Sequence, residues 1–286
     1  MEATKENKIS SGYKIAEKIT KRYAKNFYFA SLFLTKEKRN ATYAIYAICR
    51  LSDEATDKDS SLIELSTAKR NIESIYNNEP PKISILSAFK ETVDKYHIPR
   101  FYFDELIEGM YMDFCKNRYR NFPELWDYCY KVAGVVGLMI LILFGYDNDE
   151  AKDYAVRLGV AMQLTNMLRD LKEDYARGRI YLPQEEMFSF GVSENDIKEG
   201  IVNENFRSLM KFQIERARDL YRESELGIIM IADRRCRFVA SLMKEIYSGI
   251  LDEIEKNGYD VFSKRAYVNL WGKISRTIHV LRRIKK

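Results

Sequence analysis

A short charged segment, NMLRDLKED at 166–174, places Asn166, Asp170 and Asp174 four residues apart, with Arg169 beside the middle carboxylate. Residues four apart lie on one face of an α-helix. Two carboxylates on one face repel each other, so this helix requires a compensating positive charge, from a lysine or from a metal ion. Carboxylate and amide oxygens suit magnesium, which takes one or two carboxylates from a protein and bridges to phosphate oxygens.

A second acidic face occurs at 46–57, YAICRLSDEATD, where Asp53 and Asp57 are again four apart, Glu54 adds charge and Arg50 lies one turn earlier. One such pair alone is weak evidence, because acidic residues are common on solvated helix faces. Two pairs, each following a mostly apolar helix and each near an arginine, indicate a shared purpose. Arginine binds phosphate through paired hydrogen bonds. The two faces together predict a diphosphate held between two helices by magnesium, with manganese as an alternative ion.

The elements that must position these residues are helices. Only 5 prolines and 13 glycines interrupt 286 residues, and so few helix breakers favour long helices over a many-turned β protein. The chain shows no strand alternation, repeat, G-x-G-x-x-G or P-loop pattern. Apolar periodicity and turn signals predict helices over 11–33, 37–56, 83–96, 100–116, 123–145, 148–175, 203–229, 231–257 and 267–284, with one more after a loop at 58–64.

Local signals set some of these boundaries. Thr35 is the expected N-cap of the second helix, with Lys38 where a full capping box would have Glu. The segment NNEPPK at 77–82 is the clearest break in the first half. We therefore expect one all-α domain over 11–286, preceded by a polar tail at 1–10.

Composition excludes several classes of function. The net charge of +5 is mild, and no basic stripe is interleaved with aromatics, which argues against nucleic-acid binding. The four cysteines form no C-x-x-C pair, and only His97 and His279 are present. A Cys/His zinc site or a serine-hydrolase triad is therefore not expected. Buried free thiols in a reducing cytoplasm are the expected state of the cysteines.

Three segments bear on membranes. The apolar stretch at 132–146 is shorter than the roughly 20 residues of a membrane span, so we expect a buried core helix. The N-terminus is polar and shows no signal peptide. The C-terminal LRRIKK is expected to be first a solvated tail and second a contact for acidic headgroups. Together these features predict a cytoplasmic protein with peripheral membrane association.

Four ordered blocks resemble the squalene and phytoene synthases, which join prenyl diphosphates head to head. The resemblance extends from about residue 22 to 275. The blocks are NFYFASLFLTKEKRNATYAIYAICRLSDEATD at 26–57, YKVAGVVG at 130–137, LGVAMQLTNMLRDLKEDYARGRIYLP at 158–183 and GYDVFSKRAYV at 258–268. The third block is the most specific of the four. The resemblance as a whole implies an isoprenoid synthase fold, a single helical domain around a central cavity.

The resemblance also implies roles for individual residues. The magnesium positions of the family fall on Asp53, Asp57, Asn166, Asp170 and Asp174. Arg50 and Arg169 fall on positions that meet diphosphate or order the acidic pairs. The positions that line the site fall on Tyr46, Tyr128, Gln163, Tyr247 and Arg265. We expect the four aspartates, Tyr128 and Tyr247 to be catalytic.

The implied reaction joins two allylic diphosphates through a cyclopropyl diphosphate intermediate. Magnesium and arginine stabilise the leaving diphosphate, and a closed cavity keeps water from the allylic cation. Aromatic faces such as Phe27, Tyr46 and Tyr247 would stabilise that cation, each by about 1–2 kcal/mol when desolvated. The base for the last proton is either the diphosphate or a tyrosine.

The chain departs from the family pattern at the flap before the first acidic motif. Relatives commonly have Ser-x-Ser-Phe where this chain has Ala24-Lys25-Asn26-Phe27. Asn26 keeps hydrogen-bonding ability, and Lys25 could meet phosphate in place of the lost hydroxyl. The acidic motif reads DExxD where many members have DDxxD. Plant-type phytoene synthases resemble this chain in carrying Asp-Glu at these two positions.

Small residues indicate the size of the cavity. Relatives restricted to C15 substrates carry a bulky aromatic four residues after the flap Phe, where this chain has Ser31. The space favours two geranylgeranyl diphosphates and phytoene, although Phe29, Phe33 or Met139 could refill it. A further set of small residues indicates either a thin cavity wall or tight helix packing: Ala133, Gly134, Gly137, Gly159 and Ala161.

Two alternatives remain. The chain could join two farnesyl diphosphates to presqualene diphosphate, dehydrosqualene or squalene. NADPH is not expected, because the short chain shows no added nucleotide-binding segment. Alternatively, it could be a non-catalytic scaffold of the family, but a scaffold has no reason to keep both acidic pairs. A downstream desaturase is a possible partner, since phytoene is a carotenoid precursor.

Overall fold

The computed structural model describes the backbone of residues 2–57 and 62–284, and the side chains of 6–53 and 62–283. Within these residues the regular structure is helical, with two isolated bridges, Arg118–Ile180 and Tyr146–Ile231, and no sheet. The expected all-α architecture is confirmed. The elements are α1 (Glu2–Tyr23), α2 (Lys25–Ser31), α3 (Lys36–Asp57), α4 (Leu62–Tyr76), α5 (Ser84–Tyr96), α6 (Arg100–Cys115), α7 (Phe122–Cys129), η1 (Tyr130–Gly134), α8 (Val135–Phe144), α9 (Ala151–Arg169), α10 (Leu171–Ala176), α11 (Gln184–Ser189), α12 (Glu194–Glu199), α13 (Glu204–Ile228), α14 (Arg234–Lys256) and α15 (Leu270–Ile284).

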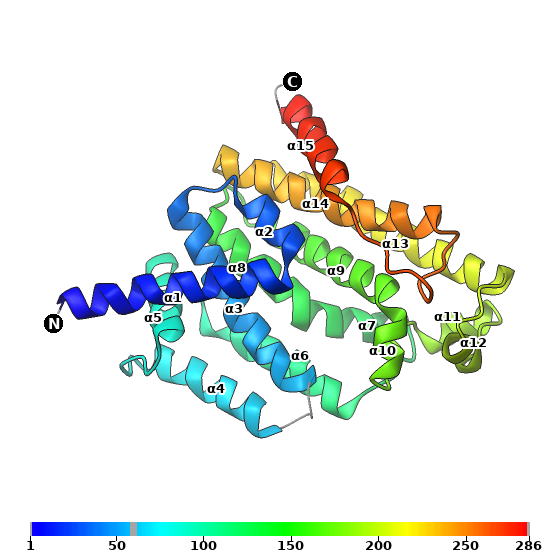
Figure 1. Cartoon of the computed structure of the whole chain (residues 1–286), viewed down its shortest axis with the longest axis horizontal. Helices are drawn as coiled ribbons and strands as arrows, with labels where there is room; N and C mark the ends of the chain where they lie inside the picture. Colours follow the sequence, from blue (N-terminus) through cyan, green and yellow to red (C-terminus); the bar gives the residue numbers. More distant parts are fainter. Residues whose placement is uncertain (1, 58–61, 285–286) are drawn as a thin grey trace.

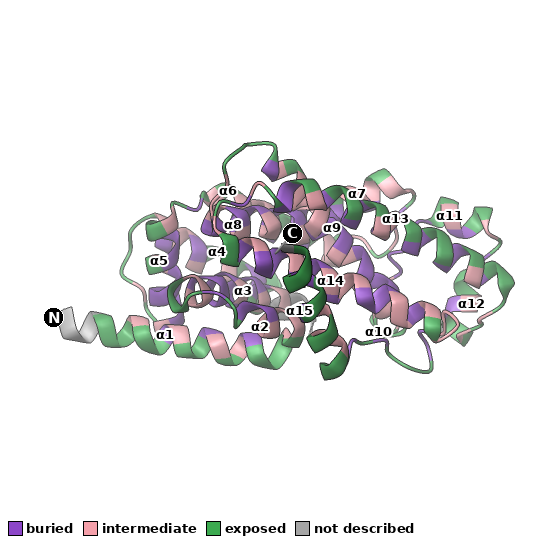
Figure 2. Ribbon diagram, turned by 90° about the horizontal axis from the view of Figure 1, so that it is seen from above, coloured by how far each residue is buried: buried purple, intermediate pink, exposed green. Residues whose placement is uncertain are grey.

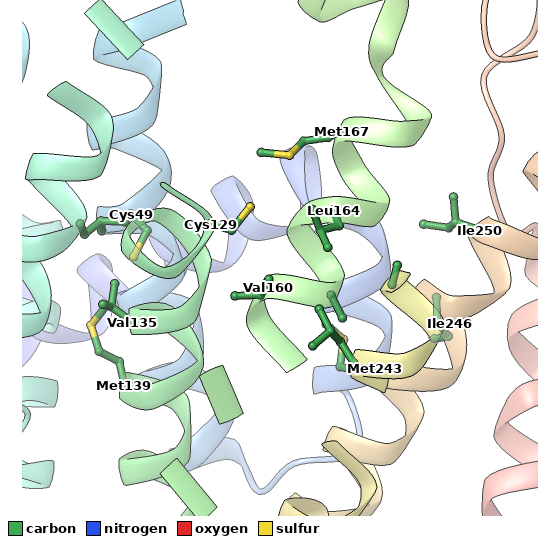
Figure 3. Packing of buried hydrophobic residues seen from close by; sticks show 14 of the residues in the cluster. Cys49, Cys129, Val135, Met139, Val160, Leu164, Met167, Met243, Ile246 and Ile250 are labelled. Carbon is green, nitrogen blue, oxygen red and sulfur yellow. The ribbon is translucent and has the colours of Figure 1, made fainter. Parts of the chain in front are cut away.

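Helix α9 lies at the centre of the molecule (Figure 1). It packs most extensively against α13, and also against η1, α8 and α14. Val160, Leu164 and Met167 of α9 are buried between the α7–α8 segment and α14 (Figure 3). Buried residues concentrate in this interior, whereas the outer faces of α1 and α15 are exposed (Figure 2).

Close packing of α9 depends on glycine. A Cβ on Gly159 would lie 2.4 Å from the Ala133 carbonyl oxygen, and one on Gly137 would lie 2.5 Å from the Ala155 carbonyl oxygen. Both distances are far inside van der Waals contact, so α9 could not approach η1 and α8 this closely with any larger residue. The tight-packing interpretation of these two small residues is therefore supported.

Several helix boundaries differ from expectation. Helix α1 begins at Glu2, within the segment expected as a tail, and the helix predicted over 11–33 is interrupted at Ala24, where φ is −128° and ψ is 60°. Neither Gly nor Pro marks this break. Helix α2 packs instead against α14, so a tertiary contact sets its direction.

The helix predicted over 148–175 begins at Ala151 and divides at Asp170 into α9 and α10. The helix over 123–145 contains a π-helical turn, η1. The last helix begins at Leu270 rather than at 267. Two short helices, α11 and α12, were not predicted, although Ser193 forms a full capping box with Asp196 at the start of α12.

Other local signals are confirmed. The Lys38 N–H donates to the Thr35 hydroxyl at 3.4 Å at the start of α3. The break at 77–82 separates α4 from α5. The described part of the expected 58–64 loop shows α4 beginning at Leu62, and residues 58–61 lie outside the described residues.

The apolar segment is longer than the sequence indicated. Residues Phe122–Phe144 form one continuous run of 23 helical residues, long and apolar enough to cross a membrane by length and composition alone. Half of its most apolar window is buried inside the protein, and the run packs between α6 and α9. These contacts agree with the expectation of a core helix.

The four cysteines are free, as expected. Cys49, Cys129 and Cys236 are buried, whereas Cys115 is exposed at the end of α6 and corrects the expectation that all four are buried. A helix end offers fewer neighbours than a helix centre, which accounts for this exposure.

Candidate active site

One large cavity of about 1120 Å³ opens between the helices. Its lining changes in character along α9, from Ala151, Ala155 and Leu158 at one end to Asn166 and Asp170 at the other. At a rise of 1.5 Å per helical residue, the distance from Ala151 to Asp170 is roughly 28 Å. The cavity therefore joins a polar end to a long apolar end, and its volume is slightly above the usual range for ligand pockets.

The residues singled out from the sequence meet in this cavity. Those with described side chains all line it: Lys25, Phe27, Ser31, Tyr46, Arg50, Asp53, Tyr128, Gln163, Asn166, Arg169, Asp170, Asp174, Tyr247 and Arg265. The side chain of Asp57 lies outside the described residues. The small residues Ala133, Gly137 and Gly159 also line the cavity, so at these positions thin walls and tight packing occur together.

The four-residue spacing of the second acidic motif survives the break between α9 and α10. Asp170 has a non-helical φ of −102° and ψ of 17°. Its N–H nevertheless donates to the Asn166 carbonyl at 2.8 Å, and the Asp174 N–H donates to the Asp170 carbonyl at 2.9 Å. These i to i−4 bonds keep all three side chains at the polar end of the cavity.

Two arginines neutralise Asp170. Arg169 donates from Nε at 2.7 Å, and Arg265 donates from Nε at 2.8 Å and from Nη2 at 3.0 Å to the other oxygen. Burial opposes ionisation of this carboxyl, but the arginine hydrogen bonds outweigh it and lower the pKa of Asp170. Arg265 comes from the loop before α15, 95 residues away, so only tertiary structure completes this arrangement.

The environment of Asp174 disfavours its ionised form. Burial, and then the negative charge of Asp170, raise its pKa to about 7. Arg177 and Arg179 oppose the shift without cancelling it. A cation bound beside Asp174 would relieve this repulsion.

The first acidic motif approaches from α3. Arg50 Nη1 donates to Asp53 Oδ2 at 2.5 Å, and the Arg50 guanidinium lies 4.7 Å from the ring centroid of Tyr23. Tyr23 ends α1, directly before the flap at Ala24. Arg50 therefore joins the acidic motif to the flap through an ion pair and a cation–π contact.

The oxygen ligands fit a magnesium ion that is shared with substrate. Among the described side chains, no group of three acidic, His or Cys residues is arranged to hold a metal by itself. Asp53 on one side and Asn166, Asp170 and Asp174 on the other border a single cavity. Magnesium commonly keeps waters, takes one or two carboxylates and bridges to phosphate. The raised pKa of Asp174 shows that a nearby positive charge would stabilise its ionised form.

Cationic side chains surround the same polar end. Eight lysines and arginines are among the described lining residues, against five acidic ones. Four of the cationic residues were not singled out from the sequence: Arg22, Arg177, Arg179 and Lys273. Burial, and then the positive charge of Lys25, lower the pKa of Lys273. Two lysines that repel each other across a flap indicate a place for an anionic group.

The flap residues form part of the wall. The rings of Phe27 and Tyr46 lie 5.5 Å apart. Ser31 is buried, with 1% of its surface exposed, and its hydroxyl donates to the Phe27 carbonyl at 2.7 Å. The Ser31 hydroxyl is thus satisfied within its own helix, so the small side chain leaves space without leaving an unpaired polar group.

A buried aspartate, Asp113, was missed by the sequence analysis. It receives hydrogen bonds from the hydroxyls of Tyr128 at 3.0 Å and Tyr181 at 2.9 Å, and Arg179 lies 3.7 Å away. Its side chain is only 5% exposed. The signal in the sequence is a single acidic residue within the apolar run MYMDFC of α6. It lies four residues after Gly109, which is buried on the same helix.

Three tyrosines of the cavity, Tyr46, Tyr128 and Tyr247, remain neutral. Burial raises the pKa of Tyr46, Tyr128 and Tyr247. For Tyr128 the neighbouring Tyr181 and the negative charge of Asp113 add to this effect. These phenols therefore present a hydroxyl and an aromatic face, not a phenolate, at neutral pH.

Comparisons with known proteins agree with this geometry. The family model described as squalene/phytoene synthase matches residues 20–272. The 15-cis-phytoene synthase of Synechococcus elongatus is 41% identical over 283 residues, 93% of this chain and 91% of that protein. Phytoene synthase 1, chloroplastic, of Arabidopsis thaliana is 40% identical over 278 residues, 93% of this chain and 65% of that protein.

Solved structures share the whole fold. A dehydrosqualene synthase crystallised with a ligand is 31% identical, with a TM-score of 0.93 and coverage of 98% of both chains. A squalene synthase from Alicyclobacillus acidocaldarius is 26% identical, with a TM-score of 0.81, over 88% of this chain and 96% of that one. The isoprenoid synthase fold expected from the sequence is confirmed. This chain belongs to the squalene/phytoene synthase family of prenyltransferases.

Proposed function

We propose that the protein joins two molecules of geranylgeranyl diphosphate head to head, through a cyclopropyl diphosphate, to give phytoene. The observation that carries the proposal is a single cavity that connects Asp53, Asn166, Asp170 and Asp174 to a long apolar end. Such a cavity suits a substrate with a diphosphate head and a prenyl tail. Relatives named phytoene synthase, at about 40% identity, support the choice of substrate.

The polar end is arranged to remove diphosphate. When bound with the substrate, magnesium would supply positive charge to the departing oxygens, held by Asp53, Asn166, Asp170 and Asp174, with Asp57 as a further expected ligand. Arg50, Arg265 and Lys25 add charge-assisted hydrogen bonds there. Negative charge that develops as the C–O bond breaks is stabilised by groups already in place.

The apolar part protects the resulting cation. Phe27 and Tyr46 present adjacent ring faces, and Tyr247 lies on α14 in the same cavity. A neutral aromatic face attracts a cation by about 1–2 kcal/mol when desolvated. A polar wall or entering water would instead quench the cation to an alcohol. Gln163 borders this region and offers its amide to the substrate head.

Tyr128 with Asp113 is the protein group best equipped to accept the last proton. Tyr128 is neutral, and its hydroxyl donates to Asp113 at 3.0 Å. A proton taken up by the Tyr128 oxygen can therefore be matched by the transfer of the phenolic proton to Asp113. The departing diphosphate is the competing acceptor.

Chain length is the finer part of the proposal. Ser31 lines the cavity and leaves space where C15-specific relatives are expected to have an aromatic ring. The alternative substrate is farnesyl diphosphate, with presqualene diphosphate, dehydrosqualene or squalene as product. The structural similarity to a dehydrosqualene synthase supports this alternative. Phytoene formation itself requires no NADPH, and a desaturase is the class of enzyme that would consume phytoene.

We place the enzyme at a membrane surface in the cytoplasm. Its proposed product is a hydrocarbon that does not dissolve in water. The C-terminal LRRIKK supplies a basic contact for acidic headgroups. The free cysteines suit a reducing compartment. Flotation with anionic vesicles tests the membrane part, and a protein that stays wholly in the soluble fraction would contradict it.

Incubation of the purified protein with magnesium tests the reaction. Geranylgeranyl or farnesyl diphosphate would be supplied separately, without and with NADPH, and the extracted hydrocarbons measured by mass spectrometry. A C40 product from the C20 substrate is expected. A C30 product would overturn the chain length, and no product from either substrate would favour a scaffold. Asp53→Ala and Asp170→Ala are the matched inactive controls.

A further inference from the structure

Helix α15 carries an apolar stripe that the rest of the protein leaves exposed. Its members are Leu270, Trp271, Ile274, Ile278 and Leu281. On a helix of 3.6 residues per turn they fall within an arc of about 100°. Trp271, the largest, is 78% exposed. Figure 2 shows α15 as a largely exposed helix at the surface.

The other side of α15 anchors the helix to the protein. Thr277 and Val280 are buried, and α14 is the main packing partner. Arg276 donates to the Glu245 carbonyl at 2.8 Å and to the Asp252 carboxylate at 2.7 Å. These contacts fix the orientation of α15. Its apolar stripe therefore faces away from the protein core.

Charge is distributed unevenly around this stripe. Residues 261–286 contain eight lysines and arginines and no acidic residue. The whole chain has a net charge of only +5, so the remaining residues are acidic on balance. Arg282 is exposed at the edge of the stripe, and the sequence continues with Lys285 and Lys286. An apolar face bordered by basic residues is typical of helices that lie in an anionic membrane surface.

The stripe begins beside the cavity. Arg265, Tyr267 and Val268, just before α15, line the cavity, as does Lys273 within its first turn. Leu270 and Trp271 lie between these lining residues in the chain and are exposed. A surface in contact with the stripe would therefore also lie next to residues that line the cavity.

We propose that the stripe of α15 docks on an anionic lipid bilayer, with Trp271 at the headgroup level and the cavity-lining segment at 265–268 next to the membrane. This inference rests on the proposed function, because a prenyl substrate and a hydrocarbon product give the enzyme a reason to bind lipid. Exposed tryptophan is favoured at the boundary between apolar and wet phases. Hydrophobic burial and attraction of the basic residues act together there.

A second copy of the chain is a poorer occupant. In a twofold dimer the same patch faces itself, so the exposed Arg282 of one copy and that of the other would both border the interface. A bilayer rich in acidic headgroups presents the opposite charge. The structure therefore favours lipid, and the experiments below distinguish the two.

Tryptophan fluorescence reports directly on the proposed contact, because the chain contains only Trp126 and Trp271. Trp126 packs against Phe122 at a ring distance of 6.0 Å. In a Trp126→Phe protein, phosphatidylcholine vesicles containing phosphatidylglycerol should shift the emission of Trp271 to shorter wavelength, and brominated lipids should quench it. Pure phosphatidylcholine should give a smaller change. Emission unaffected by anionic vesicles would overturn the proposal.

Substitutions test whether vesicle binding depends on the α15 stripe or on exposed apolar residues elsewhere on the protein. Trp271→Ser/Ile274→Ser/Ile278→Ser should weaken vesicle binding by at least about tenfold, because three exposed apolar side chains are lost. Phe188→Ser, at an 86% exposed residue of α11, is the matched control and should bind as wild type. Arg282→Gln/Lys285→Gln/Lys286→Gln should weaken binding to anionic vesicles only.

The outcomes also distinguish this inference from the reaction itself. The triple serine variant should keep its activity on substrate dispersed in detergent, since none of the three residues lines the cavity. Vesicle binding equal to wild type in that variant would overturn the assignment to α15 while leaving the reaction intact. A dimer in sedimentation that dissociates in the variant, with vesicle binding unchanged, would assign the stripe to a second copy instead.

Discussion

The phenolic hydroxyl of Tyr128 donates a hydrogen bond of 3.0 Å to the carboxylate of Asp113. The carboxylate also accepts from Tyr181 at 2.9 Å and is almost wholly buried. A buried charge of this kind is stable only while its hydrogen bonds are kept. Asp113 therefore fixes the orientation of Tyr128 and is positioned to accept the phenolic proton.

Asp113→Asn should lower kcat by about 100-fold while KM changes little, because the amide keeps the shape but cannot take a proton. Single-turnover kinetics with geranylgeranyl diphosphate would measure this. Tyr119→Phe is the control: its ring stacks on Tyr181, but its buried hydroxyl has no hydrogen-bond partner among the described residues. Wild-type kcat in Asp113→Asn would exclude the proton transfer.

Asp174 should make the stability of the metal-free protein depend on pH. Its pKa is about 7 in the folded protein, against about 3.9 for an unfolded aspartate. Between these values the folded protein keeps a proton that the unfolded chain loses. The free energy of unfolding should therefore fall as pH rises from about 4 to about 7, then level off.

Asp174→Asn should remove this part of the pH dependence. Thermal unfolding in EDTA at pH 5, 6, 7 and 8 would show the variant gaining stability over wild type as pH rises. Glu204→Gln, at a side chain that is 93% exposed, is the control and should follow wild type. Parallel curves for Asp174→Asn and wild type would contradict the raised pKa.

Ser31→Phe should shorten the preferred substrate. A phenyl ring at this buried position would fill the cavity beside Phe27, so turnover of the C20 substrate should fall by at least about tenfold relative to the C15 substrate. Competition between the two diphosphates, with products measured by mass spectrometry, gives the ratio. Ser31→Ala, which adds no volume, should leave it unchanged. An unchanged ratio in Ser31→Phe would place the length limit elsewhere.

Arg265→Gln should weaken substrate binding more than it slows the reaction. Arg265 is 57% exposed and bonds to Asp170, which Arg169 also neutralises. The loss of one partly exposed cation should raise KM by about tenfold and weaken inhibition by inorganic diphosphate. Lys264→Gln, an exposed neighbour that does not line the cavity, is the control. Inhibition equal to wild type would show that Arg265 does not meet diphosphate.

Local patterns in the sequence are sufficient to predict the helical architecture and most of the polar end of the site. Helix propensity, the cap at Thr35 and the break at 77–82 act over a few residues, so they can be found without knowledge of the fold. The spacing of Asn166, Asp170 and Asp174 follows from helix geometry in the same way. It persists across the break at Asp170 because local i to i−4 hydrogen bonds continue there.

Contacts between distant segments can be identified only in the packed tertiary structure. It interrupts the first helix at Ala24 without Gly or Pro, since α2 packs on α14. It carries Arg265 to Asp170 across 95 residues and Tyr181 to Asp113 across 68. It also leaves the apolar stripe of α15 exposed, which periodicity alone cannot distinguish from a core-facing stripe. Such pairings depend on how whole helices pack, and that information is spread over the chain rather than contained in any one segment.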